Sequence, residues 1–269
     1  MLRWLKALPL ALAIVVLIVF ATFAASCGSN NSQARFVNAI GDDTVSLDIE
    51  FNGTKVTGFG GIPPFHASGS NYVSIPAGSD QIQGLASGTA TTSFGPLTSP
   101  VSLNSGSQYT VVAAGKLPPS TTLIVAPVDT NTEPALGTVN FRVIDASAAG
   151  VGAVDVYIIP NSAPQTPNCT FGTNCSTTPT IPNVSSPLSS TTPYSGYINV
   201  PYNSLTYGYT MYVTEAGSPD PLPGWSGGYQ ISQVGSVSVG SVRTIVLVDN
   251  PGGNSGMSEA DTIVLTDLN

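Results

Sequence analysis

The stretch VSLDIEF, residues 45–51, alternates apolar and polar side chains without interruption. Its four apolar side chains fall on one face of an extended chain, because successive side chains of a strand point to opposite sides. This period of two predicts a β-strand with one buried face. Beyond residue 27 no stretch has a convincing helical period, so the fold is predicted to be all-β.

The surroundings of this strand recur later in the chain. ARFVNA at residues 34–39 precedes it, and FRVIDA at 141–146 precedes a second strand-like run, VDVYII at 154–159. Both openings place an Arg before two apolar residues, a polar residue and Ala. Three later runs match in pairs, namely 71–76 with 196–201, 108–113 with 243–248, and 122–128 with 262–266. Such repetition predicts one structural unit written twice.

Clusters of Gly, Pro, Asn and Ser separate these strand-like runs. We expect two tandem immunoglobulin-like antiparallel β-sandwiches of about seven strands each. The first covers residues 34–128, the linker 129–137 and the second 138–269. The second contains a Pro-, Ser- and Thr-rich insertion at 161–193, whose prolines exclude a central strand.

The motifs RVIDAS, AVDVYIIP and VP, within residues 142–201, resemble the family catalogued as domain of unknown function 4397. The first copy, with RFVNAI and NYVSIPAG within 35–78, is similar but more divergent. The resemblance covers nearly all of residues 34–269. It implies secreted or lipid-anchored envelope proteins with immunoglobulin-like sandwiches and no established catalytic residues. Many members have His where Asn38 and Asp145 stand, so any role of that His does not apply here.

The N-terminus has the pattern of an export signal that ends at a lipid attachment site. Arg3 and Lys6 precede an uncharged, mainly apolar run at residues 7–25. Small residues then lead to Cys27, as cleavage requires, and the site resembles the lipobox of bacterial lipoproteins. An uncleaved transmembrane anchor and an ordinary cleaved secretory peptide are the alternatives.

Cleavage before Cys27 leaves residues 1–26 as signal peptide and 27–33 as the lipidated cysteine and its spacer. Gly28 stands where an Asp commonly retains lipoproteins at the inner membrane. We therefore expect a bacterial cell-envelope protein that acyl chains anchor to the outer membrane, on its periplasmic side or at the cell surface.

Charge excludes one class of partner. Five basic and 15 acidic residues follow Cys27, a formal charge of −10. Nucleic-acid binding needs Lys and Arg to displace counterions, so no nucleic acid is expected. The same charge argues against electrostatic adhesion to anionic lipid and leaves membrane attachment to the acyl chains.

The other two cysteines sit in NCTFGTNC, with five residues between Cys169 and Cys175. In an oxidising envelope a small disulfide loop is expected, with two buried free thiols as the alternative. His66 is the only histidine and lies far from both, which argues against a zinc site. Neither a metal nor a cofactor is expected.

Catalysis is not expected. GWSGG at residues 224–228 matches the Gly-x-Ser-x-Gly pattern, but a loop precedes Ser226 and a strand-like run follows it, where a nucleophile elbow needs strand then helix. A triad would also need His66 from the other copy. An envelope hydrolase is therefore a distant alternative. Asp42-Asp43 is interpreted as a turn, with a calcium site as the alternative.

Trp225 and Tyr229 lie in a Pro- and Gly-rich loop and are the candidate ligand-binding residues, because exposed aromatic rings stack on sugars or on a partner's prolines. Arg35 and Arg142 occupy equivalent places and are expected to be structural, lying along an edge or pairing with a strand carboxylate such as Asp48 or Asp155.

The sequence thus favours a non-enzymatic, lipid-anchored envelope protein with a structural or protein-binding role through its loops. A carbohydrate-binding lipoprotein that uses the exposed aromatics is the alternative.

Overall fold

The computed structural model describes residues 30–41, 45–69, 72–94, 100–116, 121–128, 133–147, 152–163, 166–185, 192–202, 208–222, 229–231, 240–248 and 261–268. Within these ranges every regular element is a β-strand, which confirms the all-β class. They contain no helix that is long and apolar enough to cross a bilayer.

The first half of the chain forms two main sheets. The first inner sheet joins β11 (Thr121–Val128), β10 (Gln108–Gly115), β1 (Asn31–Ile40) and β4 (His66–Ala67), with β5 (Val73–Pro76) also paired to β1. The first outer sheet joins β3 (Thr54–Lys55), β2 (Leu47–Phe51), β7 (Ile82–Ala86) and β8 (Thr92–Phe94). A separate pair consists of β6 (Gly78–Asp80) and β9 (Val101–Leu103).

The second half repeats this plan. The second inner sheet joins β16 (Ile198–Pro201), β12 (Thr138–Asp145), β19 (Val242–Val248) and β20 (Asp261–Leu268). The second outer sheet joins β14 (Thr166–Pro167), β13 (Ala153–Ala163), β17 (Tyr209–Glu215) and β18 (Tyr229–Gln230), with β15 (Ile181–Ser185) paired to β13. Strands β12, β19 and β20 thus stand in the same order as β1, β10 and β11.

One strand pair in each half departs from the predicted antiparallel pattern. β1 runs parallel to β10, with Arg35 opposite Thr110, and β12 runs parallel to β19, with Arg142 opposite Thr244. A parallel pair cannot be closed by a hairpin and needs a long crossover. The outer-sheet strands lie within that crossover, so each half passes from inner sheet to outer sheet and back.

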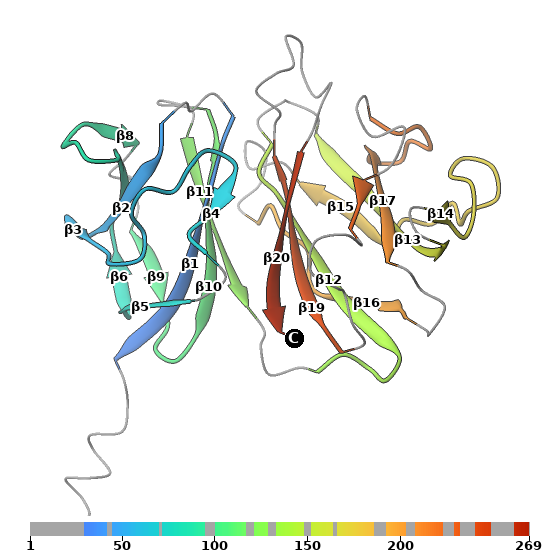
Figure 1. Ribbon diagram of the computed structural model, residues 1–269, viewed down its shortest axis with the longest axis horizontal. Helices are drawn as coiled ribbons and strands as arrows, with labels where there is room; N and C mark the ends of the chain where they lie inside the picture. Colours follow the sequence, from blue (N-terminus) through green and yellow to red (C-terminus); the bar gives the residue numbers. More distant parts are fainter. Residues whose placement is uncertain are drawn as a thin grey trace, which may run out of the picture.

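The four sheets stack as layers, with the two inner sheets in the middle (Figure 1). Alternate residues of β1 serve different cores. Phe36 faces the apolar cluster inside the first half, while Val37 and Ala39 belong to a cluster shared by both inner sheets. From the second half this shared cluster includes Ile144, Val246 and Leu265, among others. Strands buried on both faces are usual for parallel pairs.

The alternation at residues 47–51 is confirmed. Leu47, Ile49 and Phe51 are buried in the core of the first half, whereas Val45 lies before the strand and is 42% exposed. The predicted boundaries at 128 and 138 fall between β11 and β12. Because the inner sheets share a core, the division into two domains stays a prediction.

Candidate functional site

A groove of about 280 Å³ opens on the second half, beside the disulfide loop. Two segments bring its walls together, the chain between β14 and β15 and the turn after β17. Its lining residues are Asp155, Tyr157, Phe171, Gly172, Thr173, Cys175, Ser176, Thr177, Pro179, Gly217, Ser218 and Pro219. The volume is close to the lower end of small-molecule sites.

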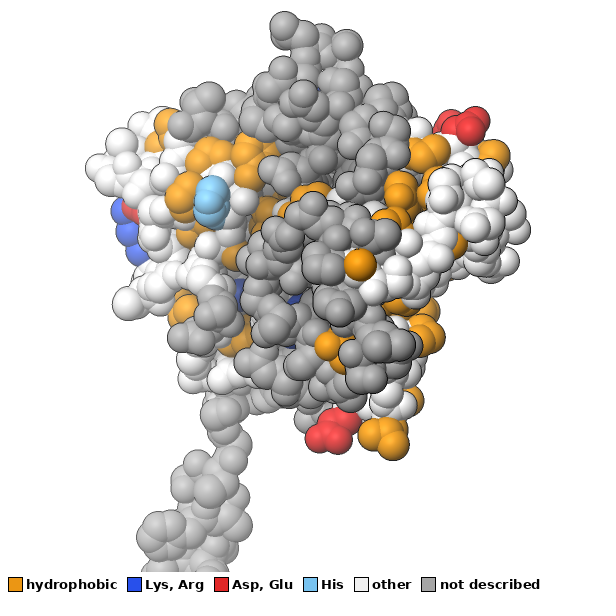
Figure 2. Space-filling view, turned by 45° about the vertical axis from the view of Figure 1, so that its right-hand side comes forward, with side chains coloured by type: hydrophobic (Ala, Val, Ile, Leu, Met, Phe, Trp, Pro, Cys, Tyr) orange, Lys and Arg blue, Asp and Glu red, His pale blue; other side chains and the backbone are white. Residues whose placement is uncertain are grey.

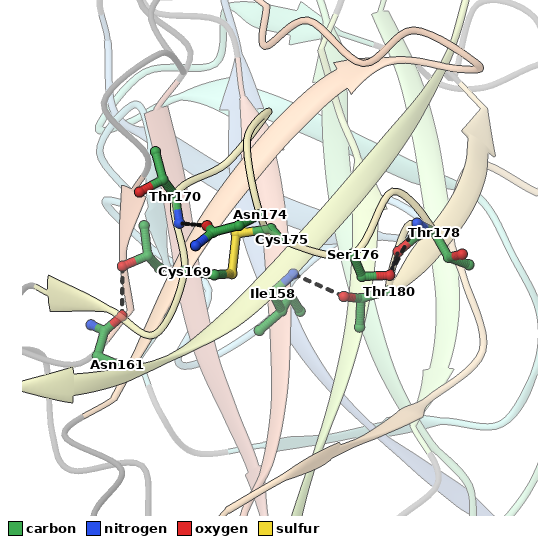
Figure 3. Close-up of a disulfide and its surroundings, with 10 residues drawn as sticks. Ile158, Asn161, Cys169, Thr170, Asn174, Cys175, Ser176, Thr178 and Thr180 are labelled. Carbon is green, nitrogen blue, oxygen red and sulfur yellow. Dashed lines mark hydrogen bonds between the residues drawn. A yellow bond between two sulfur atoms is a disulfide. The ribbon is translucent and has the colours of Figure 1, made fainter.

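A disulfide between Cys169 and Cys175 closes the loop that forms one wall (Figure 3). Within the loop, Asn174 Oδ1 accepts a hydrogen bond from the Thr170 backbone N–H at 2.6 Å. Further along, the Ile158 N–H of β13 donates to Thr180 Oγ1 at 3.0 Å, which holds the returning chain against the strand. The loop is therefore fixed at both ends, although its polar sequence could not form a core of its own.

Phe171, at the centre of the disulfide loop, is held by two tyrosines of the second outer sheet. Its ring stacks on Tyr212 with centroids 4.5 Å apart and meets Tyr157 edge-on at 4.8 Å. Tyr157 and Tyr212 are cross-strand partners on β13 and β17. Aromatic pairs in these geometries add to simple burial. We call these three residues the aromatic platform.

Asp155 lines the groove and is only 5% exposed. Its Oδ1 accepts the Asn183 N–H at 2.8 Å, and its Oδ2 accepts the Gly217 N–H at 2.9 Å. Burial raises the pKa of the Tyr157 phenol, and the negative charge of Asp155 raises it further. The Asp155 carboxylate thus lines the groove and accepts hydrogen bonds from two backbone N–H groups.

The equivalent residue of the first half, Asp48, is surrounded differently. It accepts hydrogen bonds from Lys55 Nζ at 2.9 Å, Ser87 Oγ at 2.8 Å, and the N–H groups of Gly61 and Gly88 at 2.9 and 3.1 Å. Lys55 and these donors hold the pKa of the Asp48 carboxyl well below its ordinary value. Asp48 therefore accepts from four donors, whereas Asp155 accepts from two.

Arg35 and Arg142 are structural, as expected, but the predicted partners Asp48 and Asp155 are wrong. Both arginines lie between the inner sheets, 0% and 1% exposed. The two aspartates point away from this interface, on the other face of the outer sheets, because they alternate with core residues of β2 and β13. The arginines therefore find partners across the interface.

The two arginines make matched but unequal contacts. Arg35 donates to Thr110 Oγ1 at 3.1 Å and to the Thr266 carbonyl at 2.7 Å, and forms an ion pair with Asp267. Arg142 donates to Thr244 Oγ1 at 2.7 Å, to Thr110 Oγ1 at 3.1 Å and to the Pro127 carbonyl. The ion pair with a carboxylate is thus made by Arg35.

A tyrosine covers each guanidinium. Tyr72 lies over Arg35 at 5.1 Å and Tyr197 over Arg142 at 4.9 Å, both measured from the guanidinium carbon to the ring centroid. Tyr197 also donates to Asp267 Oδ2 at 2.8 Å. Burial raises the pKa of Tyr72 to about 12 and raises that of Tyr197 as well. Arg35, Arg142 and Asp267 therefore have their hydrogen-bond and ion-pair partners within the interface between the inner sheets, and we assign them a structural role.

Among the predicted site residues that the structure describes, Cys175 lines the groove and Tyr229 does not. Cys27, Asp42-Asp43, Trp225 and Ser226 lie outside the described residues. Tyr229 lies on β18, packs against the core of the second half and donates to the Thr262 carbonyl at 3.4 Å.

His66 is exposed on β4, with Nδ1 2.7 Å from the Pro64 carbonyl oxygen. The part of the chain that the structure describes holds no group of three His, Cys, Asp or Glu side chains able to bind a metal ion. On the face shown in Figure 2, charged side chains are few and scattered among the described residues.

The disulfide was predictable from the sequence, whereas the positions of Phe171 and Asp155 in the groove were not. One signal was present, since Phe171 is the only aromatic residue between the two cysteines. A disulfide that constrains a loop also constrains the large side chain within it.

Residues 32–157 match the family model described as domain of unknown function DUF4397. The match runs through the first half and ends inside β13, so it includes both arginine openings. No curated protein is significantly similar to the chain.

Among solved structures, the chain is similar to a family 26 carbohydrate-binding module from Eubacterium rectale Amy13K, determined with maltoheptaose. The alignment has 14% identity, covers 87% of this chain and 95% of that one, and gives a TM-score of 0.21. At this score the similarity carries no inference about fold or ligand.

Proposed function

We propose that this chain is a non-enzymatic binding protein of the bacterial cell envelope, anchored by acyl chains on Cys27, that takes up a ligand in the groove beside its disulfide loop. The observation that carries the proposal is the fixed position of Phe171. The disulfide and the rings of Tyr157 and Tyr212 hold it at the groove wall. Binding costs less when the site is already ordered.

The lining has the composition of a binding site. Aromatic carbon comes from Tyr157 and Phe171, hydroxyl groups from Ser and Thr residues, and one carboxylate from Asp155. A few polar groups that converge on an apolar surface fix the orientation of a ligand. The Asp155 carboxylate already accepts hydrogen bonds from two backbone N–H groups. Among the described residues that line the groove, no hydrogen bond joins a nucleophile to a general base. This favours binding over turnover.

The anchor would hold the first half close to the membrane. β1 starts at Asn31, four residues after Cys27, and four extended residues span at most about 14 Å. Asp155 and Tyr157 of the groove lie on β13, and the sheet of β13 and β17 stands on the side of the molecule away from β1 (Figure 1). A protein anchored in this way would present the groove away from its attachment point.

The proposal is tested by binding of the full-length protein, in detergent micelles, to solubilised envelope material from its own cells. Thr173 is exposed at the groove wall, and Thr173→Trp would fill the groove without touching the core. The matched control is Thr91→Trp at an exposed turn of the first half. We expect saturable binding that Thr173→Trp abolishes and Thr91→Trp leaves intact. Equal binding by all three proteins, or none by any, contradicts the proposal.

Anchoring is tested separately. Cys27→Ser should abolish incorporation of labelled palmitate and move the protein from the membrane fraction to the soluble fraction. Retention of Cys27→Ser in membranes, with residues 1–26 still attached in the intact mass, would support an uncleaved anchor.

A purely structural role is the second candidate, and the shared core between the inner sheets favours it. That core makes the two halves a stiff unit able to serve as a spacer. This role predicts that Thr173→Trp changes neither envelope binding nor growth, while variants of the shared core change both.

A further inference from the structure

We infer that the ligand of the groove is an uncharged polysaccharide, in which a sugar residue donates hydroxyl hydrogen bonds to Asp155 and places its C–H face against Tyr157 and Phe171. The inference rests on the proposed function and names the chemical class of its ligand. It comes from comparing Asp155 with Asp48, residues that occupy the same place in the two halves.

The two sites share their backbone framework. Asp48 accepts from Gly61 N–H and Gly88 N–H, and Asp155 accepts from Asn183 N–H and Gly217 N–H. The turns also match, since the N–H of Ser87 donates to the Ser46 carbonyl and that of Ala216 donates to the Ala153 carbonyl. Ala216 therefore stands where the first half has Ser87.

Among the residues that the structure describes, the two side-chain donors of the first half have no counterpart around Asp155. Ser87 is replaced by Ala216, and the short hairpin that carries Lys55 is replaced by the longer segment with the disulfide loop. None of the residues that line the groove is basic. A carboxylate offers about four acceptor sites, and the backbone donors use two of those on Asp155. Asp155 lines the groove, so a ligand with two donors would supply what Lys55 and Ser87 supply to Asp48.

Charge selects among such ligands. The chain after Cys27 carries a formal charge of −10, and the groove adds a buried carboxylate without a basic neighbour in its lining. Anionic polymers are therefore repelled. Neighbouring hydroxyl groups of a neutral sugar can donate to one carboxylate, and hydrogen bonds to a charged acceptor are the stronger kind.

The rest of the lining favours a sugar over an amine. Thr173, Ser176, Thr177 and Ser218 place hydroxyl groups around the aromatic surface. A sugar ring has hydroxyls at its edge and an apolar C–H face, so it can use both parts of the wall. The methylene chain of a lysine would contact the aromatic carbon but leave the hydroxyl groups without a partner.

The test uses the full-length protein in micelles of a detergent without a sugar headgroup. Native gels are cast with soluble starch, laminarin, dextran or galactomannan, which are all neutral, and migration is compared with a gel that lacks polysaccharide. Ala216→Ser introduces the hydroxyl donor that Ser87 gives to Asp48, so it competes with the ligand for Asp155. The matched control is Ser87→Ala, which removes the same donor from the first half.

We expect at least one polysaccharide to retard the wild-type protein. Ala216→Ser should weaken that binding by about fivefold or more, as for the loss of one hydrogen bond, while Ser87→Ala leaves it unchanged. Thermal unfolding establishes that each variant is folded. If Ala216→Ser binds the polysaccharide as tightly as the wild type, the role of Asp155 is wrong.

Failure of this inference differs from failure of the proposed function. One outcome would be that none of the polysaccharides binds, while envelope material binds and Thr173→Trp abolishes this binding. If that binding also persists after periodate oxidation of the envelope material, the groove binds a ligand other than a sugar. Competition by spermidine would then identify an ammonium ligand in the place of Lys55. If neither polysaccharide nor envelope material binds, both proposals fall.

Discussion

The two halves place a buried aspartate at the same point of corresponding strands, yet Asp48 accepts hydrogen bonds from four donors and Asp155 from two. Lys55 and Ser87 complete the hydrogen bonding of Asp48. Around Asp155 only the backbone donors are retained, and a disulfide loop with an aromatic platform replaces the lysine hairpin. A repeated fold can therefore surround the same buried carboxylate with side-chain donors in one copy and place it on a groove in the other.

The arginines offer a comparison with the largest expected effect. Arg35→Met would remove the ion-pair partner of the buried Asp267 carboxylate and should cost about 3–5 kcal/mol of unfolding free energy. Arg142→Met loses only neutral acceptors and should cost about 1–3 kcal/mol. Urea unfolding followed by tyrosine fluorescence measures both. Equal costs would show that Asp267 is not the source of the asymmetry.

The disulfide lies beside the groove of the second half, whereas residues 34–128 of the first half contain no cysteine. Cys169→Ser combined with Cys175→Ser should lower the unfolding free energy by about 2 kcal/mol. The value is at the low end for disulfides, because this one closes a short loop and so restricts the unfolded chain only modestly. The double substitution should also release Phe171 and reduce binding in the groove. Dithiothreitol treatment of the wild-type protein should reproduce both effects. A variant that binds normally would show that the aromatic platform alone orders the loop.

Exchanging the hydroxyl donor tests the comparison directly. Ser87→Ala should cost about 1 kcal/mol, because it removes a hydrogen bond to a charged acceptor while three donors remain on Asp48. Ala216→Ser should change stability by less, since Asp155 already holds its backbone donors. The two melting temperatures give the comparison. A larger change for Ala216→Ser would mean that the groove cannot accept the added hydroxyl.

The smallest effect concerns acid stability. The folded-state pKa of Asp48 is lowered, chiefly by Lys55, so its stabilisation is complete above the unfolded pKa of about 4 and is lost as pH falls below it. Lys55 is half exposed, and Lys55→Met should cost no more than about 1 kcal/mol at neutral pH. Carbon-13 titration of the Asp48 carboxyl should show its pKa rising in the variant. An unchanged pKa would assign the shift to the backbone donors.

The sheets were predictable because their signals are local. Alternation over residues 47–51 identifies a face, and the repeated arginine openings identify equivalent strands. The partners of Arg35 were not predictable, because Asp267 lies 232 residues away and its approach depends on how the inner sheets pack. Asp48 is nearer in sequence but lies on the opposite side of the first half.

The site was predictable only in part. Cys169 and Cys175 paired on composition and spacing alone. The position of Phe171 against Tyr212 depends on the way the loop folds back over the outer sheet, which no local pattern records. Tyr229, chosen because its loop is rich in Gly and Pro, packs against the core instead. Residue type identified an aromatic candidate, whereas the topology determined which aromatic side chain lines the groove.

The ion pair between Arg35 and Asp267 joins the first strand to β20, and this connection constrains the order of folding. The first half can collapse around its own core as it leaves the ribosome or a translocation channel. The interface between the inner sheets cannot close until β20 has been synthesised and released. Until then, both arginines and the apolar residues around them remain in water, and folding of such distant contacts is slow. Export in an unfolded state, as proposed above, would be compatible with this fold, because the contact between β1 and β20 would form only after β20 has emerged.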